Sequence, residues 1–263
     1  MIDSVQIERS GPRVITFDPR KIKYDEDGIP VLTVRQIEAV AKELLGIYCQ
    51  DVMEGPKMTR VVEIIQKLGE RTKLSFEMQD LGWNGTAKVL GKVSFHKRTL
   101  CLDFSLQGER AAAFRFTAAH EIGHWVLHRH NYKKWNFDSS SPTKDWVEDD
   151  EHTLCCLSQR RQRGWLEFQA NVFAAELVTP RDMFVTALVE IQLAMDIKKN
   201  IGLIYLSNNN SSQRDFEIIV ARLSEIFGVS KQCVRVRIKT LQLLEYEGNS
   251  RLKYEATAGR LPI

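Results

Sequence analysis

The chain has 263 residues, a formal net charge of +3, and 43% hydrophobic and 27% charged residues, which is typical of a soluble globular protein with a full-sized core. So small a charge is no argument for nucleic-acid binding, no stretch is long and apolar enough to span a membrane, and residues 1–13 lack the apolar centre of a signal peptide. Five cysteines, two of them adjacent, do not form a disulfide framework, so we expect a cytoplasmic protein with reduced thiols and no membrane partner.

The first part of the chain is predicted to be scaffold. Residues 1–30 are polar and contain Gly-Pro and Gly-Ile-Pro breakers, which predicts an extended N-terminal arm. Thr33 is a typical cap for a helix whose apolar residues recur at helical spacing, and Thr59 is predicted to open a second helix that closes near Gly69. Both helices belong to a main domain that we expect over residues 31–200.

A change of period marks the next segment. Over residues 73–104 apolar and polar residues alternate, and positions 84–85 and 97–98 are turn signals. This pattern predicts a small antiparallel sheet. In its last strand Cys101 is expected on the face opposite the core.

The most informative stretch is Ala111–His130, AAAFRFTAAHEIGHWVLHRH, which is predicted to be helical. His120 and His124 are one turn apart, about 6 Å along the axis, so both imidazoles can bind one metal ion. Glu121 is rotated roughly a quarter turn from His120 and can reach a water on the metal without being a ligand. Gly123 costs about 1 kcal/mol in a helix interior, which makes sense where another element comes close. The spacing favours zinc; the alternative is an amphipathic helix with polar residues on its wet face.

A second helix supplies a candidate third ligand. It is predicted over Trp165–Val178 and stops before Pro180. Glu167 can complete a His, His, Glu site that leaves the fourth zinc position open. Asn171, one turn later, can orient a metal ligand. The alternative is that Glu167 is a solvated acid at the start of the helix.

Residues 131–164 form a long connection between these helices. It contains an acidic run, the adjacent cysteines and a basic cluster of Arg160, Arg161 and Arg163. A connection of this length is either functional or disordered. We interpret it as a lid or partner-binding insert, with a solvated surface insert as the alternative.

Residues 201–263 are predicted to form a C-terminal helical part packed on the core. Leu223–Phe227 and Val234–Leu244 are helical patterns joined by Gly-Val-Ser, which is helix-turn-helix spacing. Arg235 and Arg237, with the arginines of the insert, are candidate DNA contacts. Short helix pairs of this kind are nevertheless more often packing units than DNA readers.

Taken together, the chain resembles the ImmA/IrrE family of zinc metallopeptidases over about residues 30–245. The resemblance rests on RFTAAHEIGHWVLHR at Arg115–Arg129, LEFQANVFAAELVTP at Leu166–Pro180 and IFGVSKQCVRVRI at Ile226–Ile238. It implies an α+β, mainly helical zincin-like fold with a small antiparallel sheet and a C-terminal helix-turn-helix-like part. It also implies that the third block belongs to the peptidase unit itself.

By matching positions, the resemblance implies that His120, His124 and Glu167 bind Zn²⁺ and that Glu121 is the catalytic base. Members of the family cut a helix-turn-helix repressor of the Xre type, often encoded nearby. The implied partner is therefore such a repressor, whose cleavage derepresses an operon for a stress or DNA-damage response, a mobile element or phage defence.

The expected mechanism is hydrolysis of a peptide bond. Zinc would lower the pKa of water towards about 7, and Glu121 would take a proton from that water and pass it to the leaving amine. A further donor to the oxyanion is needed, for which His128 and Tyr132 are candidates. His128 is equally plausible as a structural contact at the end of the helix.

We also hypothesise a regulatory role for Cys101. In zinc peptidases an edge strand beside the metal helix pairs with the extended substrate, and the strand that contains Cys101 is the natural candidate. A thiolate reaching the open metal position would expel the nucleophile and hold the enzyme inactive. Single-stranded DNA could release such a lock. The alternative is that Cys101 is an ordinary small hydrophobe in the sheet.

Two rival functions come from other classes. One is a DNA-binding transcriptional regulator whose metal site is structural. The other is a noncatalytic metal-bound adaptor that binds a partner without cutting it.

Overall fold

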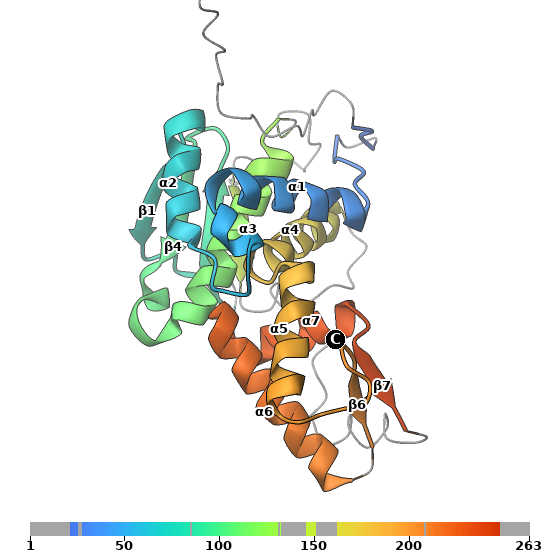
Figure 1. Ribbon diagram of the computed structural model, residues 1–263. Coiled ribbons are helices and arrows are strands. Elements are labelled where there is room, and N and C mark those ends of the chain that lie inside the picture. Colours follow the sequence, from blue (N-terminus) through green and yellow to red (C-terminus); the bar gives the residue numbers. More distant parts are fainter. Residues whose placement is uncertain are drawn as a thin grey trace, which may run out of the picture.

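The structure is a computed structural model that describes residues 22–25, 28–84, 86–130, 132, 146–150, 162–207 and 209–247 (Figure 1). Its helices are α1 (Val34–Tyr48), α2 (Val61–Thr72), α3 (Ala111–His128), α4 (Gln162–Val178), α5 (Arg181–Ala194), α6 (Asn210–Phe227) and α7 (Lys231–Thr240). Its strands are β1 (Ser75–Gln79), β2 (Trp83–Asn84), β3 (Ala87–Ser94), β4 (Thr99–Asp103), β5 (Trp146–Asp150), β6 (Ile204–Leu206) and β7 (Leu244–Tyr246). The expected α+β, mainly helical fold is confirmed.

The described end of the N-terminal arm joins the core. Tyr24 and Pro30 form an isolated antiparallel bridge, and Ile29 is fully buried. Residues 1–21 of the expected arm lie outside the described residues.

Helix α1 forms as its sequence predicts. The hydroxyl of Thr33 accepts a hydrogen bond from the backbone N–H of Gln36, and the Gln36 side chain accepts one from the backbone N–H of Thr33. This capping box satisfies two donors that the first turn leaves without helical partners. The apolar stripe of α1 is buried, and the helix packs against α4.

The bounds of α2 differ from those expected. Thr59 does not cap it, because its hydroxyl donates a hydrogen bond to the carbonyl of Leu177. The helix continues beyond Gly69 and ends where Lys73 adopts the left-handed conformation, at φ 59°. A Cβ on Gly69 would lie 2.6 Å from the carbonyl oxygen of Leu74, so this glycine allows a close backbone approach rather than ending the helix.

The sheet is mixed, which corrects the expectation of a purely antiparallel one. Both turn signals join antiparallel strands as predicted, β2 to β3 and β3 to β4. However, β1 pairs with β4 in parallel, and the strand order is β1-β4-β3-β2, with β5 also on β3. Alternation in the sequence indicates which face of each strand is apolar, but not the order and direction in which the strands join.

The strand that contains Cys101 is central, so its predicted role as a substrate-binding edge is wrong. Strand β4 pairs with β1 along its full length on one side and with β3 on the other. All its residues are buried, and Cys101 is only 1% exposed. No free edge of β4 is left for an extended peptide.

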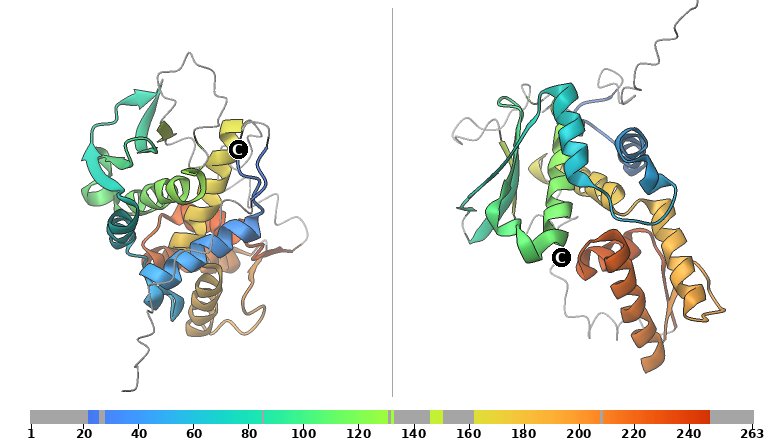
Figure 2. Two further views of the ribbon diagram at one scale, coloured as in Figure 1. Left: turned by 90° about the horizontal axis from the view of Figure 1, so that it is seen from above. Right: turned by 60° about the vertical axis from the view of Figure 1, so that its left-hand side comes forward.

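Helix α3 lies between the sheet and α4 (Figure 2). It packs against β3 and β4 on one side and against α4 on the other, and α4 in turn packs against α1. A Cβ on Gly123 would lie only 3.2 Å from the Cα and carbonyl oxygen of Ala170. The close approach expected at Gly123 is therefore made by α4, at Ala170, and it brings α3 and α4 together.

The C-terminal part packs on the core, but it is not wholly helical as expected. After α7 the chain adds β7, which pairs in parallel with β6. Gly228 ends α6 at φ 62°, and its carbonyl accepts a hydrogen bond of 2.6 Å from Arg115 of α3. The turn between α6 and α7 is thus fixed against α3. Residues 248–263 lie outside the described chain.

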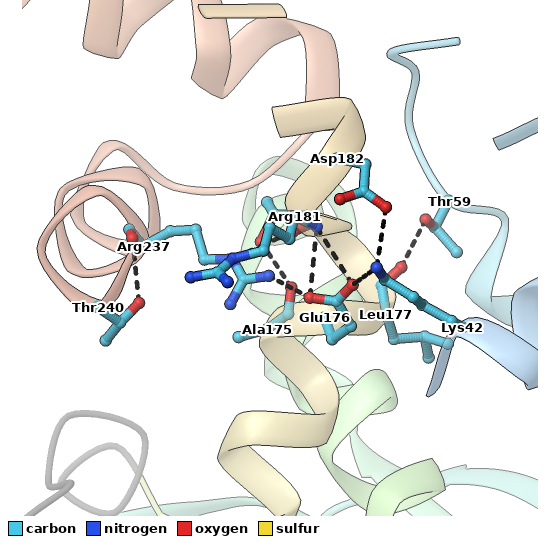
Figure 3. A network of polar contacts seen from close by, with 10 residues as sticks. Lys42, Thr59, Ala175, Glu176, Leu177, Arg181, Asp182, Arg237 and Thr240 are labelled. Carbon is cyan, nitrogen blue, oxygen red and sulfur yellow. Dashed lines mark hydrogen bonds and ion pairs between the residues drawn. The ribbon is translucent and has the colours of Figure 1, made fainter. Parts of the chain in front are cut away.

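A buried ion pair fastens α7 to the end of α4 (Figure 3). The guanidinium of Arg237 pairs with the carboxylate of Glu176, and both side chains are almost fully buried. Arg237 also donates to the carbonyl of Thr179, at 3.1 Å, and the backbone N–H of Arg181 donates to Glu176. The expectation that Arg237 contacts DNA is therefore wrong, since its charge is used inside the fold.

Removing one partner of this pair should destabilise the protein strongly. Arg237→Met leaves the buried Glu176 carboxylate with the more distant Lys42, at 4.0 Å, as its remaining described cation, and we expect a loss of about 3–5 kcal/mol in unfolding free energy, measured by urea denaturation. Arg237→Met combined with Glu176→Met should recover most of that loss.

Arg235→Met is the matched control, because Arg235 pairs with Glu217 on the neighbouring surface and such pairs contribute about 1 kcal/mol or less. Equal effects of the two arginine substitutions would contradict the assignment of Arg237 as the structural fastener.

Candidate metal centre

The site is built where α3 and α4 cross. From Thr117 to His128 every residue of α3 is buried, so the polar side chains of this segment face the interior and do not form the wet face of an amphipathic helix. His120, Glu121 and His124 are all fully buried, and Glu167 of α4 is 8% exposed. Four ionisable groups removed from water in this way need partners, because burying a polar group without one costs free energy.

Three ligand atoms converge on one point. Nε2 of His120 and Nε2 of His124 lie 2.9 Å apart, and Oε2 of Glu167 lies 3.0 Å from the first and 3.3 Å from the second. In a tetrahedral site with metal–ligand bonds of about 2.0–2.1 Å, neighbouring ligand atoms are about 3.3 Å apart. The three atoms therefore fit three corners of such a site, and His120, His124 and Glu167 form a group that could hold a metal ion.

Asn171 sets the orientation of the first imidazole. Its side-chain oxygen lies 2.9 Å from Nδ1 of His120. Since that oxygen only accepts, Nδ1 carries the hydrogen and Nε2 presents its lone pair to the Glu167 side. This contact is the one expected for Asn171, one turn after Glu167.

The ionisation states suit a metal site. Burial lowers the pKa of His124, and it lowers the pKa of His128 well below its ordinary value. Burial by itself would raise the pKa of Glu167, but the neighbouring His124 and His120 outweigh it and hold that pKa well below its usual range. Neutral imidazoles and an ionised carboxylate are the forms that bind a metal ion.

Glu121 lies against the sheet. A Cβ built on Gly91 of β3 would come within 2.7 Å of Oε1 of Glu121, so the glycine leaves the room that this carboxylate occupies. The sequence interpretation did not single out Gly91. The available signal was a glycine inside an alternating strand pattern, which often marks a close approach of another group.

The structure does not bring Cys101 into the cluster. Among the described residues, the converging ligand atoms come from His120, His124 and Glu167. Burial raises the pKa of the Cys101 thiol to about 11, so near neutral pH this thiol is protonated as long as no metal ion contacts it. The position of Cys101 outside the group of converging ligand atoms argues against an inhibitory fourth ligand.

The two candidate oxyanion donors have different surroundings. Nδ1 of His128 is 3.0 Å from Nδ1 of His124, and its Nε2 is 3.2 Å from the side-chain oxygen of Gln169. With both ring nitrogens bonded to interior groups, His128 is not placed as an oxyanion donor. Tyr132 stacks on Phe95 with ring centroids 5.2 Å apart, and its role as a donor stays a prediction.

Most candidate DNA contacts cannot be placed. Arg160, Arg161 and the side chain of Arg163 lie outside the described residues, as do Cys155 and Cys156. Arg235 is partly exposed and forms an ion pair with Glu217 at 2.5 Å. Within the described chain, no helix is both long and apolar enough to cross a bilayer.

Comparison with known proteins agrees with this geometry. The family model described as Peptidase_M78, IrrE N-terminal-like domain, matches residues 94–239, more than half of the chain. The matched region includes α3, α4, α6 and all but the last residue of α7. No curated protein matches the chain.

We expect the purified chain to bind one zinc ion. Glu167→Ala should lower zinc affinity by more than the 10–100-fold typical of an outer contact, because it removes a direct ligand. Chelator competition gives the affinity, and elemental analysis gives the stoichiometry.

The control is Glu190→Ala, which removes an exposed carboxylate from α5 and should leave zinc affinity unchanged. If Glu167→Ala also bound zinc like the unaltered chain, the third ligand would be misassigned.

Proposed function

Because the chain belongs to the Peptidase_M78 family, defined by the IrrE N-terminal-like domain, we propose that it is a zinc-dependent endopeptidase whose substrate is a helix-turn-helix repressor of the Xre type. Membership of this family supports a metallopeptidase with a protein substrate. The observation that carries the proposal is the convergence of His120, His124 and Glu167 beside a buried second carboxylate, Glu121.

In the proposed reaction each residue has a separate role. His120, His124 and Glu167 hold zinc, which supplies the Lewis acidity that makes water more acidic near neutral pH. Glu121 accepts the proton of the attacking water and passes it to the leaving amine. Its position between α3 and β3, against Gly91, keeps the carboxylate in one place and limits its solvation. Tyr132 is the remaining proposed donor to the oxyanion.

The choice of repressor as substrate is supported by the family and not by the geometry. Cleavage of such a repressor would derepress a stress, DNA-damage, mobile-element or phage-defence operon. Single-stranded DNA as an activator also stays a proposal. The DNA-binding regulator is the weaker alternative, because Arg237 is buried within the fold and Arg235 is paired with Glu217.

The insert gives a further part of the proposal. Strand β5, which lies within residues 131–164, pairs antiparallel with β3 from Val89 to Ser94. This is the edge of β3 opposite β4, in the strand that contains Gly91 beside Glu121. An extended substrate that adds to the sheet here needs the same backbone groups. We therefore propose that the insert is a lid that leaves this edge before a substrate pairs with it.

Glu121→Gln should abolish most of the cleavage and keep the metal. We expect a fall of about 10²–10⁴-fold in the rate of cleavage of a neighbouring Xre-type repressor, because the amide cannot accept the proton. Cleavage is followed by mass spectrometry of the fragments, with and without chelator.

Glu109→Gln, an exposed glutamate ahead of α3, is the matched control and should cleave normally. Undiminished cleavage by Glu121→Gln would exclude it as the base. A repressor left intact while another protein is cut would overturn the substrate class alone.

Proline substitutions in β5 should increase the rate of repressor cleavage if the insert covers the edge of β3. Neighbouring residues of an antiparallel strand point their N–H groups to opposite sides, so Val147→Pro with Glu148→Pro removes one donor to β3 whichever residue supplies it. The same change in the Glu121→Gln chain should give no cleavage, which controls for a contaminating protease. An unchanged or lower rate would contradict the lid.

A further inference from the structure

A chain of buried hydrogen bonds runs from His124 to the backbone near the N-terminal arm. Nδ1 of His124 lies 3.0 Å from Nδ1 of His128, and Nε2 of His128 lies 3.2 Å from Oε1 of Gln169. The amide nitrogen of Gln169 then donates to the carbonyl of Pro30 at 2.6 Å. All three side chains are at most 1% exposed, so these bonds form away from solvent.

The carbonyl of Pro30, the last group in this series of hydrogen bonds, determines which group donates and which accepts in each bond. A carbonyl only accepts, so the group of Gln169 that faces Pro30 is its NH₂. The other end of the same amide is an oxygen, which also only accepts. Nε2 of His128 must therefore carry a hydrogen and donate it to Gln169.

The next step sets the tautomer of His124. A neutral imidazole with its hydrogen on Nε2 has a lone pair on Nδ1, and the deep burial of His128 favours this neutral form because a charged ring would lose its hydration. Nδ1 of His128 thus accepts, and Nδ1 of His124 donates. The lone pair of Nε2 of His124 is left pointing to where Nε2 of His120 and Oε2 of Glu167 converge.

We propose that Gln169 and His128 are positioning residues that hold His124 in the metal-binding tautomer and ring orientation. This inference rests on the proposed zinc site. The two imidazoles are set by different means, since His120 is oriented by one bond to Asn171 of α4. His124 depends on a relay of two side chains that ends at Pro30, so the segment just before α1 supports the metal centre.

The affinity for zinc tests the relay directly. His128→Phe keeps a ring of similar size and removes the acceptor, and we expect zinc affinity to fall about 10–100-fold. His128→Gln keeps a side-chain oxygen that can accept from His124 and should stay within a few-fold of the unaltered chain. His96→Phe, the same change at an exposed histidine, is the control. Equal affinity of His128→Phe and the unaltered chain would overturn the proposal.

A double-variant cycle tests whether the two residues act in series. Gln169→Leu should also weaken zinc binding, but Gln169→Leu with His128→Phe should be little worse than His128→Phe, because the second change breaks a relay that is already broken. Effects that add fully would contradict a relay. Thermal unfolding of the metal-free chains shows which variants remain folded.

The ring hydrogens are observable without any substitution. In the zinc-loaded chain, long-range ¹H–¹⁵N correlation spectra should show that Nε2 of His128 is protonated and that its Nδ1 is unprotonated. The opposite tautomer would overturn the relay while leaving the zinc site intact. Failure of the unaltered chain to bind zinc would instead overturn the proposed metal site.

Discussion

The close contact between α3 and α4 is the constraint on which the site depends. A Cβ at position 123 would lie 3.2 Å from the backbone of Ala170, tighter than an ordinary contact, so glycine lets the helices come this near without crowding. Glu167 and Asn171 lie within one turn of Ala170 on α4, and they reach His120 for that reason. A wider spacing would leave two imidazoles and a carboxylate buried apart, each with its own desolvation penalty.

Helix α4 is held at its middle and at its end by polar contacts in the interior. At its middle, Gln169 joins it to Pro30 and to His128 of α3. At its end, Glu176 pairs with Arg237 of α7. The N-terminal segment and the C-terminal helices therefore both position the helix that supplies Glu167. In this helix-turn-helix-like unit the basic side chain of Arg237 is therefore used for packing against α4.

The sheet leaves room for the Glu121 side chain and has an edge, on β3, that a further strand can join. Gly91 leaves room for Glu121 against β3, while β4 is buried between two strands and cannot take up a further one. The edge of β3 is occupied by β5, a strand of the long insert. Because backbone pairing needs no particular side chains, the same edge suits an extended segment of this chain or of another protein.

The sequence by itself determined the parts of the protein that local spacing governs. The cap of α1, the helical face shared by His120 and His124, the close approach at Gly123, and the family all follow from short patterns. Only the tertiary structure decided that β1 runs parallel to β4, that Cys101 lies in a central strand, that Arg237 is buried, and that Gly91 and Gln169 serve the site. These features depend on residues far apart in the chain, which periodicity cannot place side by side because it reports the exposed and buried faces of an element and not its neighbours.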